Sequence, residues 1–265
     1  MAGFEFLLNE LDEHGVLTLT LNRADCLNAF NDEMSFELQK ALKDAEKNAD
    51  VRSIVLTGAG RGFSAGQDLR SRSVAANGAT PHLGDSIRER YSPIISKLRS
   101  MEKPVLASIN GVAAGAGASL AFACDLRIAN SSAKFIQAFV KVGLIPDSAA
   151  CWLLPRLVGF GRAMELALLG DVISADTALQ WGLVNQVVPD DQLTVATQQL
   201  AQQLAQGPTQ AIGLIKRAMN KAMSVDLDTY LAYEANLQEI AGRTHDYQEG
   251  VSAFLEKRPA QFAGR

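Results

Sequence analysis

The sequence predicts an α/β fold of repeated strand–strand–helix units, followed by a helical C-terminal region. Apolar, β-rich runs at 53–57 and 105–109 each lead into a glycine-rich passage and then into a helical pattern. From residue 193 onward the apolar spacing is helical throughout. We therefore expect a core at 1–192 that holds the functional site and a separate helical region at 193–265.

Length and composition exclude several classes of protein. The 265 residues are 48% apolar, so a large core is available, and a net charge of −4 argues against a nucleic-acid partner. Three cysteines without metal-ligand spacing indicate reduced thiols and no metal site. The N-terminus lacks a secretory pattern, and no apolar run has the length of a membrane span. We expect a cytoplasmic protein that binds neither nucleic acid nor membrane.

The first elements follow from alternation and from helical spacing. Residues 16–21 alternate apolar and hydroxyl side chains, which is typical of a half-buried strand. Residues 32–48 then predict a helix that Asn31 or Asp32 can cap. The apolar stripe of this helix consists of Met34, Leu38, Leu42 and Ala45.

The middle of the chain alternates loops, helices and short strands. A polar stretch at 70–85 is expected to be a mobile loop beside the site, because long loops often act as lids. A helix is expected at 87–98, and short strands are expected at 127–129 and 134–136.

Two apolar stripes mark the C-terminal helices, which Gly207-Pro208 separates. The first stripe consists of Leu193, Ala196, Leu200 and Leu204, and the second of Ile212, Ile215 and Met219. Such stripes could fold back on the core of the same chain or pack against other subunits, and the pattern leaves both arrangements open.

Two glycine-rich passages are the most informative features, GAGRGFSAGQDL at 58–69 and NGVAAGAGASL at 110–120. Neither has the spacing of a phosphate loop or of a dinucleotide fingerprint. Small residues leave backbone N–H groups open to a ligand oxygen, and two N–H groups aimed at one oxygen form an oxyanion hole. One passage alone would favour the structural interpretation, in which the glycines only allow a strand to pack tightly against a helix.

The two passages and their surroundings resemble the crotonase superfamily of enoyl-CoA hydratases and isomerases almost from end to end. The similar segments are 18–23, 27–30, 62–69, 103–125, 143–147 and 253–258. The resemblance implies a spiral of repeated ββα units whose C-terminal helices build trimers, or hexamers as dimers of trimers. It also implies an acyl-CoA thioester as substrate and no separate cofactor, because coenzyme A is part of that substrate.

The resemblance places the two oxyanion donors at the N–H groups of Ala65 and Ala116. Ala116 would lie in the first turn of a helix that begins near Gly115, where unpaired N–H groups and the helix dipole favour a developing enolate. The other residues that it implies for substrate binding are Ser64, Gly66, Gln67, Asp68, Leu69, Gly115, Phe139, Leu144 and Ile145, with Phe254 and Lys257 acting across a subunit boundary.

The carboxylates distinguish between reactions within the superfamily. Hydratases use two glutamates, and the matching positions here are Ser119 and Phe139, so hydration is not expected. Asp147 follows a proline and precedes a helical stretch, which by itself favours a helix cap. The resemblance implies instead that Asp147 is the acid/base of an isomerase, while Asp68 holds its turn through side-chain hydrogen bonds.

Within the superfamily, the stretches 111–118, 143–156 and 241–254 are most similar to isomerases that rearrange a ring-epoxidised phenylacetyl-CoA to an oxepin-CoA. A Δ3,Δ2-enoyl-CoA isomerase for linear chains uses the same parts and is the alternative. A noncatalytic relative that binds acyl-CoA or RNA is the hypothesis from another class. The acidic balance weighs against RNA, and Asp147 beside an oxyanion hole weighs against loss of catalysis.

Overall fold

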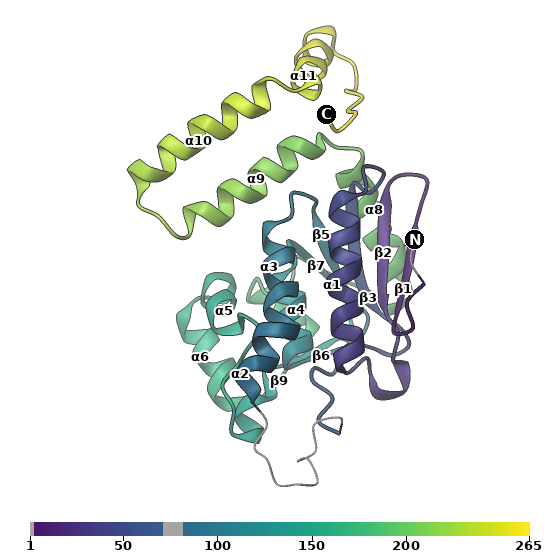
Figure 1. Ribbon diagram of the computed structural model, residues 1–265, viewed down its shortest axis with the longest axis vertical. Coiled ribbons are helices and arrows are strands. Elements are labelled where there is room, and N and C mark those ends of the chain that lie inside the picture. Colours follow the sequence, from purple (N-terminus) through teal and green to yellow (C-terminus); the bar gives the residue numbers. More distant parts are fainter. Residues whose placement is uncertain (1–2, 71–81) are drawn as a thin grey trace.

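The computed structural model describes residues 3–70 and 82–265 and contains two sheets in this part of the chain (Figure 1). The larger sheet has the order β1 (Leu7–Leu11), β2 (Val16–Leu21), β3 (Ser53–Gly58), β5 (Val105–Ile109), β7 (Leu126–Asn130) and β10 (Gln186–Val188). The smaller sheet has the order β4 (Gly62–Ser64), β6 (Val112–Ala114), β8 (Lys134–Ile136) and β9 (Val172–Ser174). The predicted α/β class and the expected strands of the core are confirmed.

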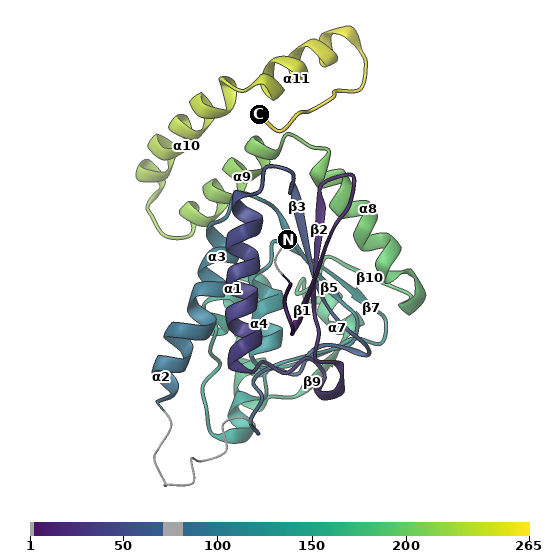
Figure 2. The same cartoon turned by 45° about the vertical axis from the view of Figure 1, so that its right-hand side comes forward.

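Helices cover both faces of the larger sheet, whose strands are parallel from β2 to β10 (Figure 2). On one face lie α1 (Asp32–Lys47) and α3 (Ser92–Ser100), and on the other lies α8 (Leu193–Ala205). The Asn31 side chain accepts a hydrogen bond from the N–H of Met34 at 3.0 Å, so the expected cap of α1 is confirmed. All four residues of the predicted α1 stripe are buried.

The smaller sheet brings the two glycine-rich passages together. The strands β4 and β6 lie inside these passages and pair in parallel, with Gly62 opposite Val112 and Ser64 opposite Ala113. The sequence predicted strands only before the passages, because glycine and alanine have low strand propensity. Since the carboxyl ends of paired parallel strands meet at one edge, the turns that follow β4 and β6 lie side by side.

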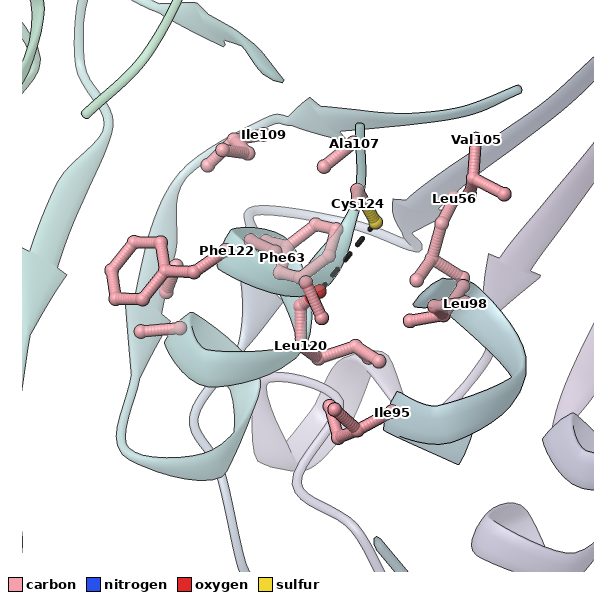
Figure 3. Close-up of a cluster of buried hydrophobic side chains, with 14 of the residues drawn as sticks. Leu56, Phe63, Ile95, Leu98, Val105, Ala107, Ile109, Leu120, Phe122 and Cys124 are labelled. Atoms are coloured by element: carbon pink, nitrogen blue, oxygen red, sulfur yellow. Dashed lines mark hydrogen bonds between the residues drawn. The ribbon is translucent and has the colours of Figure 1, made fainter. Parts of the chain in front are cut away.

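The side chains of Leu120 and Phe122, on the buried helix α4 (Ala116–Ala123), belong to one apolar cluster with Leu56 of the larger sheet and Phe63 of the smaller one (Figure 3). Each residue of α4 is buried, and the Phe122 ring stacks on Phe135 of β8 with centroids 6.4 Å apart. Just after α4, the Cys124 thiol donates to the carbonyl of Leu120 at 3.5 Å, and burial raises the pKa of Cys124 to about 12. Cys124 is therefore a neutral thiol of the core, and all three cysteines are free.

Part of the stretch at 70–85 is helical. Residues 71–81 of the expected loop lie outside the described residues, but α2 (Leu83–Ser86) and a π-helical turn η2 (Ile87–Tyr91) lead directly into α3. A loop at 83–85 was therefore a wrong expectation. The remaining elements are η1 (Ala24–Cys26), η3 (Ala138–Val142), α5 (Ala150–Val158), α6 (Phe160–Leu169), α7 (Ala175–Gln180) and η4 (Asp190–Gln192).

The C-terminal helices extend away from the sheets (Figure 1). They are α9 (Thr209–Ala222), α10 (Leu227–Gly242) and α11 (His245–Glu256), and the predicted break at Gly207-Pro208 is confirmed. The boundary at residue 193 between a core and a separate helical region stays a prediction. The helix α8 packs on the larger sheet, where Ala201 and Ala205 share a buried apolar cluster with Leu106 of β5. Between α9, α10 and α11 lies an apolar groove of about 730 Å³.

Candidate active site

The turns after β4 and β6 contact each other closely at Gly66. This residue has φ +90°, and a Cβ built on it would lie 2.7 Å from the carbonyl oxygen of Ala114 and 3.2 Å from the nitrogen of Ala116. Gly117 is confined in the same way, because its Cβ would lie 2.5 Å from the carbonyl oxygen of Ser64. Only glycine allows the two backbones to approach this closely.

The structure contradicts the expectation that Ala65 is the first oxyanion donor. The N–H of Ala65 donates to the carbonyl of Leu27 at 2.8 Å and is therefore committed to the fold. Ser64 is fully buried, and its hydroxyl donates to the carbonyl of Asn28 at 2.8 Å and accepts from the N–H of Gly66 at 3.2 Å. Ser64, which was expected to bind substrate, thus shapes the turn instead.

In this turn the N–H of Gln67 has no hydrogen-bond partner among the described residues. The residues on either side of it, Gly66 and Asp68, pair with the backbone of Phe30. The N–H of Phe30 donates to the Gly66 carbonyl at 2.7 Å, and the carbonyl of Phe30 accepts from the N–H of Asp68 at 2.9 Å. No hydrogen bond is formed by the Gln67 N–H within residues 3–70 and 82–265. Because a trans peptide directs its N–H opposite to its carbonyl, this donor lies on the side away from Phe30. The sequence indicated Gln67 as a substrate contact but not as the donor.

The second donor that the resemblance implies, the N–H of Ala116, lies at the start of α4. Gly115, with φ +50°, precedes α4, and its own N–H donates to the Ile136 carbonyl at 2.9 Å. The helical bonds of α4 begin at Ser119, whose N–H donates to the Gly115 carbonyl at 3.0 Å. The N–H of Ala116 therefore belongs to the unpaired first turn, at the positive end of the helix dipole.

The two positions that correspond to hydratase glutamates cannot hold a water for attack. Ser119 is fully buried, and its hydroxyl donates to the Gly115 carbonyl at 3.1 Å. Phe139 is 9% exposed, and its ring carbons lie 3.8 Å from the position of a Cβ on Gly115. A committed hydroxyl and an apolar ring therefore replace two carboxylates beside the oxyanion donors.

Asp147 does not cap the helix that follows it. The helix α5 starts at Ala150, and the cap position belongs to Ala149, so a capping role for Asp147 was a wrong interpretation. The Asp147 carboxylate is half-buried and accepts from the Ser148 hydroxyl at 2.8 Å. Ser148 and Ala149 have φ values of 52° and 64°, and consecutive left-handed residues of this kind cluster at functional sites.

Asp68, at the end of the first glycine-rich turn, forms the side-chain hydrogen bonds that were expected to hold this turn, and its contact with substrate stays a prediction. It forms an ion pair with Arg23 at 3.1 Å and accepts from the N–H of Arg70 at 3.1 Å. The Arg23 guanidinium also donates to the carbonyl of Ala29. Asp68 thus fixes the end of the first turn against the segment before α1.

The remaining predicted residues are exposed in a single chain. Leu69, Leu144 and Ile145 are exposed, whereas Phe139 is buried. Phe254 and Lys257 are exposed at the end of α11, and Figures 1 and 2 place α11 at the opposite end of the molecule from β9. The chain alone does not bring these two residues to the oxyanion donors.

Neither a metal-binding cluster nor a membrane-spanning helix is found within residues 3–70 and 82–265. No group of three His, Cys, Asp or Glu side chains is arranged to hold a metal ion there. None of the helices in the same ranges is both long and apolar enough to cross a membrane.

Comparisons with known proteins agree with this geometry. The chain is 53% identical over 261 residues to a 1,2-epoxyphenylacetyl-CoA isomerase of Escherichia coli strain K12, covering 98% of this chain and 99% of that protein. It is 35% identical to a trans-2-decenoyl-[acyl-carrier-protein] isomerase of Streptococcus mutans, covering 99% of each. An enoyl-CoA hydratase structure from Bacillus anthracis superposes with a TM-score of 0.90 at 34% identity, covering 98% of this chain and 100% of that one.

The family model for enoyl-CoA hydratase/isomerase matches residues 12–265. That match includes both glycine-rich turns, the segment of Asp147 and all of the C-terminal helices. The chain belongs to the enoyl-CoA hydratase/isomerase family.

Proposed function

We propose that this protein is an acyl-CoA isomerase that rearranges 2-(1,2-epoxy-1,2-dihydrophenyl)acetyl-CoA to oxepin-CoA in phenylacetate breakdown. It also shifts double bonds in unsaturated acyl-CoA thioesters. The 53% identity to a 1,2-epoxyphenylacetyl-CoA isomerase over nearly the whole of both chains supports this substrate. The coenzyme A moiety enters as part of the substrate, no separate cofactor is needed, and the reaction takes place in the cytoplasm.

The two backbone donors supply the electrostatic part of the mechanism. The thioester oxygen accepts hydrogen bonds from the N–H groups of Gln67 and Ala116. When a proton leaves the carbon next to the thioester, the negative charge moves onto this oxygen. The donors and the α4 dipole then stabilise the enolate more than the neutral thioester, which lowers the barrier.

Asp147 carries the proton in this mechanism. Its carboxylate removes the proton from the α-carbon and returns it to a carbon further along the conjugated system. In the epoxide, the carbon–carbon bond shared by the six-membered ring and the oxirane also breaks, and its electron pair enters the double bonds of the seven-membered oxepin. One C–H bond breaks and one forms, so substrate and product have the same composition. One group that both removes and returns a proton gives isomerisation without addition of water.

The observation that carries the proposal is that a serine and a phenylalanine stand near the α4 N-terminus at the positions where hydratases have glutamates. Ser119 is committed to the Gly115 carbonyl and Phe139 is a buried ring, so the site lacks the pair of carboxylates that activates water. Asp147 remains as the acid/base. In a trimer or hexamer, Phe254 and Lys257 would reach the coenzyme A bound by a neighbouring subunit, which explains why they are remote from the site in one chain.

A linear-chain enoyl-CoA isomerase is the second candidate, and the 35% identity to a trans-2-decenoyl-[acyl-carrier-protein] isomerase favours it. Turnover of epoxyphenylacetyl-CoA and of a linear 3-enoyl-CoA by the same purified protein separates the two. We expect a higher kcat/KM for the epoxide. A preference for the linear substrate would select the second candidate, and turnover of neither would indicate a noncatalytic relative.

A further inference from the structure

The side chain of Gln67, whose N–H is the first oxyanion donor, is fixed at both ends of its carboxamide. Its Nε2 donates to the Phe30 carbonyl at 3.0 Å. Its Oε1 accepts from the hydroxyl of Tyr91. The donor residue is therefore connected to the π-helical turn η2 through one side-chain hydrogen bond.

The position of the Tyr91 hydroxyl is itself strongly constrained. The phenol is 5% exposed, and its ring packs edge-on against Phe30 with centroids 5.9 Å apart. The turn that carries it is tied to α1, because the Gln39 amide donates to the Glu89 carbonyl at 2.8 Å. A π-helical turn inserts an extra residue into a helix and is frequently found at functional sites.

The Gln67 N–H needs such a constraint, because the residue before it is a glycine, which restricts backbone rotation least. Gly66 has φ +90° and no side chain, so the peptide between Gly66 and Gln67 can rotate at small cost. The hydrogen bonds from Phe30 to this turn fix one side of the peptide. The Gln67 carboxamide adds a second anchor, which depends on Tyr91.

We propose that Tyr91 is a positioning residue of the oxyanion hole, acting through the Gln67 carboxamide on the N–H of Gln67. This inference rests on the proposed function and adds to it a role for a residue that does not touch the substrate. It predicts that loss of the phenol hydroxyl weakens catalysis more than substrate binding, because the donor matters most when charge develops on the thioester oxygen.

The test compares three variants in isomerase turnover. Tyr91→Phe keeps the ring contact with Phe30 and removes only the hydroxyl. We expect kcat to fall roughly tenfold with little change in KM, a fraction of the 100- to 1000-fold that loss of one donor costs. Gln67→Leu should have a similar effect, and the double variant should lose no more than Gln67→Leu alone. Additive losses, or normal kcat in a folded Tyr91→Phe, would overturn the proposal.

A spectroscopic readout separates this inference from the proposed function. Cinnamoyl-CoA, a conjugated thioester, should absorb at longer wavelength when two N–H groups polarise its carbonyl. We expect a smaller red shift in Tyr91→Phe and a normal one in Asp147→Asn, which changes the proposed acid/base and leaves both N–H donors in place. A normal shift in Tyr91→Phe, or none in the unaltered protein, would contradict the inference whatever substrate the enzyme turns over.

Discussion

A Cβ placed on Gly66 would lie 3.2 Å from the backbone nitrogen of Ala116. This contact joins the two glycine-rich turns, which are separated by about fifty residues in the sequence and meet only because β4 pairs with β6. The proposed oxyanion hole is therefore formed by two backbones in contact, with no side chain between them. Substitutions at this contact should affect the chemistry directly.

Gly66→Ala should lower kcat/KM by about 100-fold or more, because the methyl group enters the space beside the Ala116 N–H. Gly159→Ala is the matched control, since Gly159 has φ +79° and no atom within 4 Å of the added Cβ. Both variants should lose stability from the positive φ. Turnover measured beside a melting curve checks this, and equal activity of the two variants would show that Gly66 is not at the oxyanion hole.

The purified protein should form negligible 3-hydroxyacyl-CoA from a 2-enoyl-CoA such as crotonyl-CoA. The buried Ser119 hydroxyl and the Phe139 ring cannot bind and deprotonate a water between them. Chromatography of the products after long incubation gives the measurement. Efficient hydration would mean that other groups activate water, and the argument against hydratase activity from Ser119 and Phe139 would then be wrong.

The sequence predicted the core elements well where apolar periodicity was strong. The strand at 105–109 and the α1 stripe match the structure because burial of one face dictates their spacing. The strands β4 and β6 were not predicted, since glycine and alanine conceal a strand whose stability comes from pairing. Tertiary pairing, which a single sequence does not display, decided these two elements.

The site was predictable in its location but not in its hydrogen bonds. Ala116 follows from its place at a helix start, whereas Ala65 was wrong because its N–H donates to the distant Leu27 carbonyl. The donor role proposed for Gln67 depends on the bridge to Phe30, thirty-seven residues away. Asp147 resembled a helix cap, but the left-handed Ala149 displaces the helix start. Backbone partners far apart in the sequence were the missing information.

Acid should weaken the contacts that Arg258 and Gln261 make with Glu249 of α11. Hydrogen bonds from Arg258 and from the N–H of Gln261 lower the pKa of Glu249 from 4.5 to about 2. A lowered pKa means that this contact stabilises the fold above about pH 4.5 and is lost as the pH falls toward 2.

Amide exchange of Gln261, whose N–H donates to Glu249, measures this loss across the same pH range, and Ala263 and Gly264, whose N–H groups donate to the buried Asp246, serve as the reference. In Glu249→Gln the Gln261 amide should exchange faster already at neutral pH, because the charged partner of Arg258 is lost. Protection of the Gln261 amide that persists unchanged in the unaltered protein down to pH 2 would show that Glu249 does not hold it.

The protein should sediment as a trimer or hexamer at assay concentration. The groove between α9, α10 and α11 is apolar, and Ile215, Met219 and Phe254 are exposed on its walls in a single chain. Closed symmetric assembly is the usual way to cover such a surface. A monomer that is fully active would refute a role for Phe254 and Lys257 across a subunit boundary.

Isomerase turnover of Asp147→Asn, measured with a melting curve on the same sample, tests the central claim most directly. The amide oxygen of asparagine can still accept the Ser148 hydroxyl, so we expect an unchanged melting temperature and normal acyl-CoA binding. Asparagine cannot take a proton from carbon, so kcat should fall by roughly 100-fold or more. Asp171→Asn, at an exposed carboxylate 3.4 Å from Lys141, should behave like the unaltered protein. Full activity in a stable Asp147→Asn would contradict the assignment of Asp147 as the acid/base and, with it, the proposed isomerase mechanism.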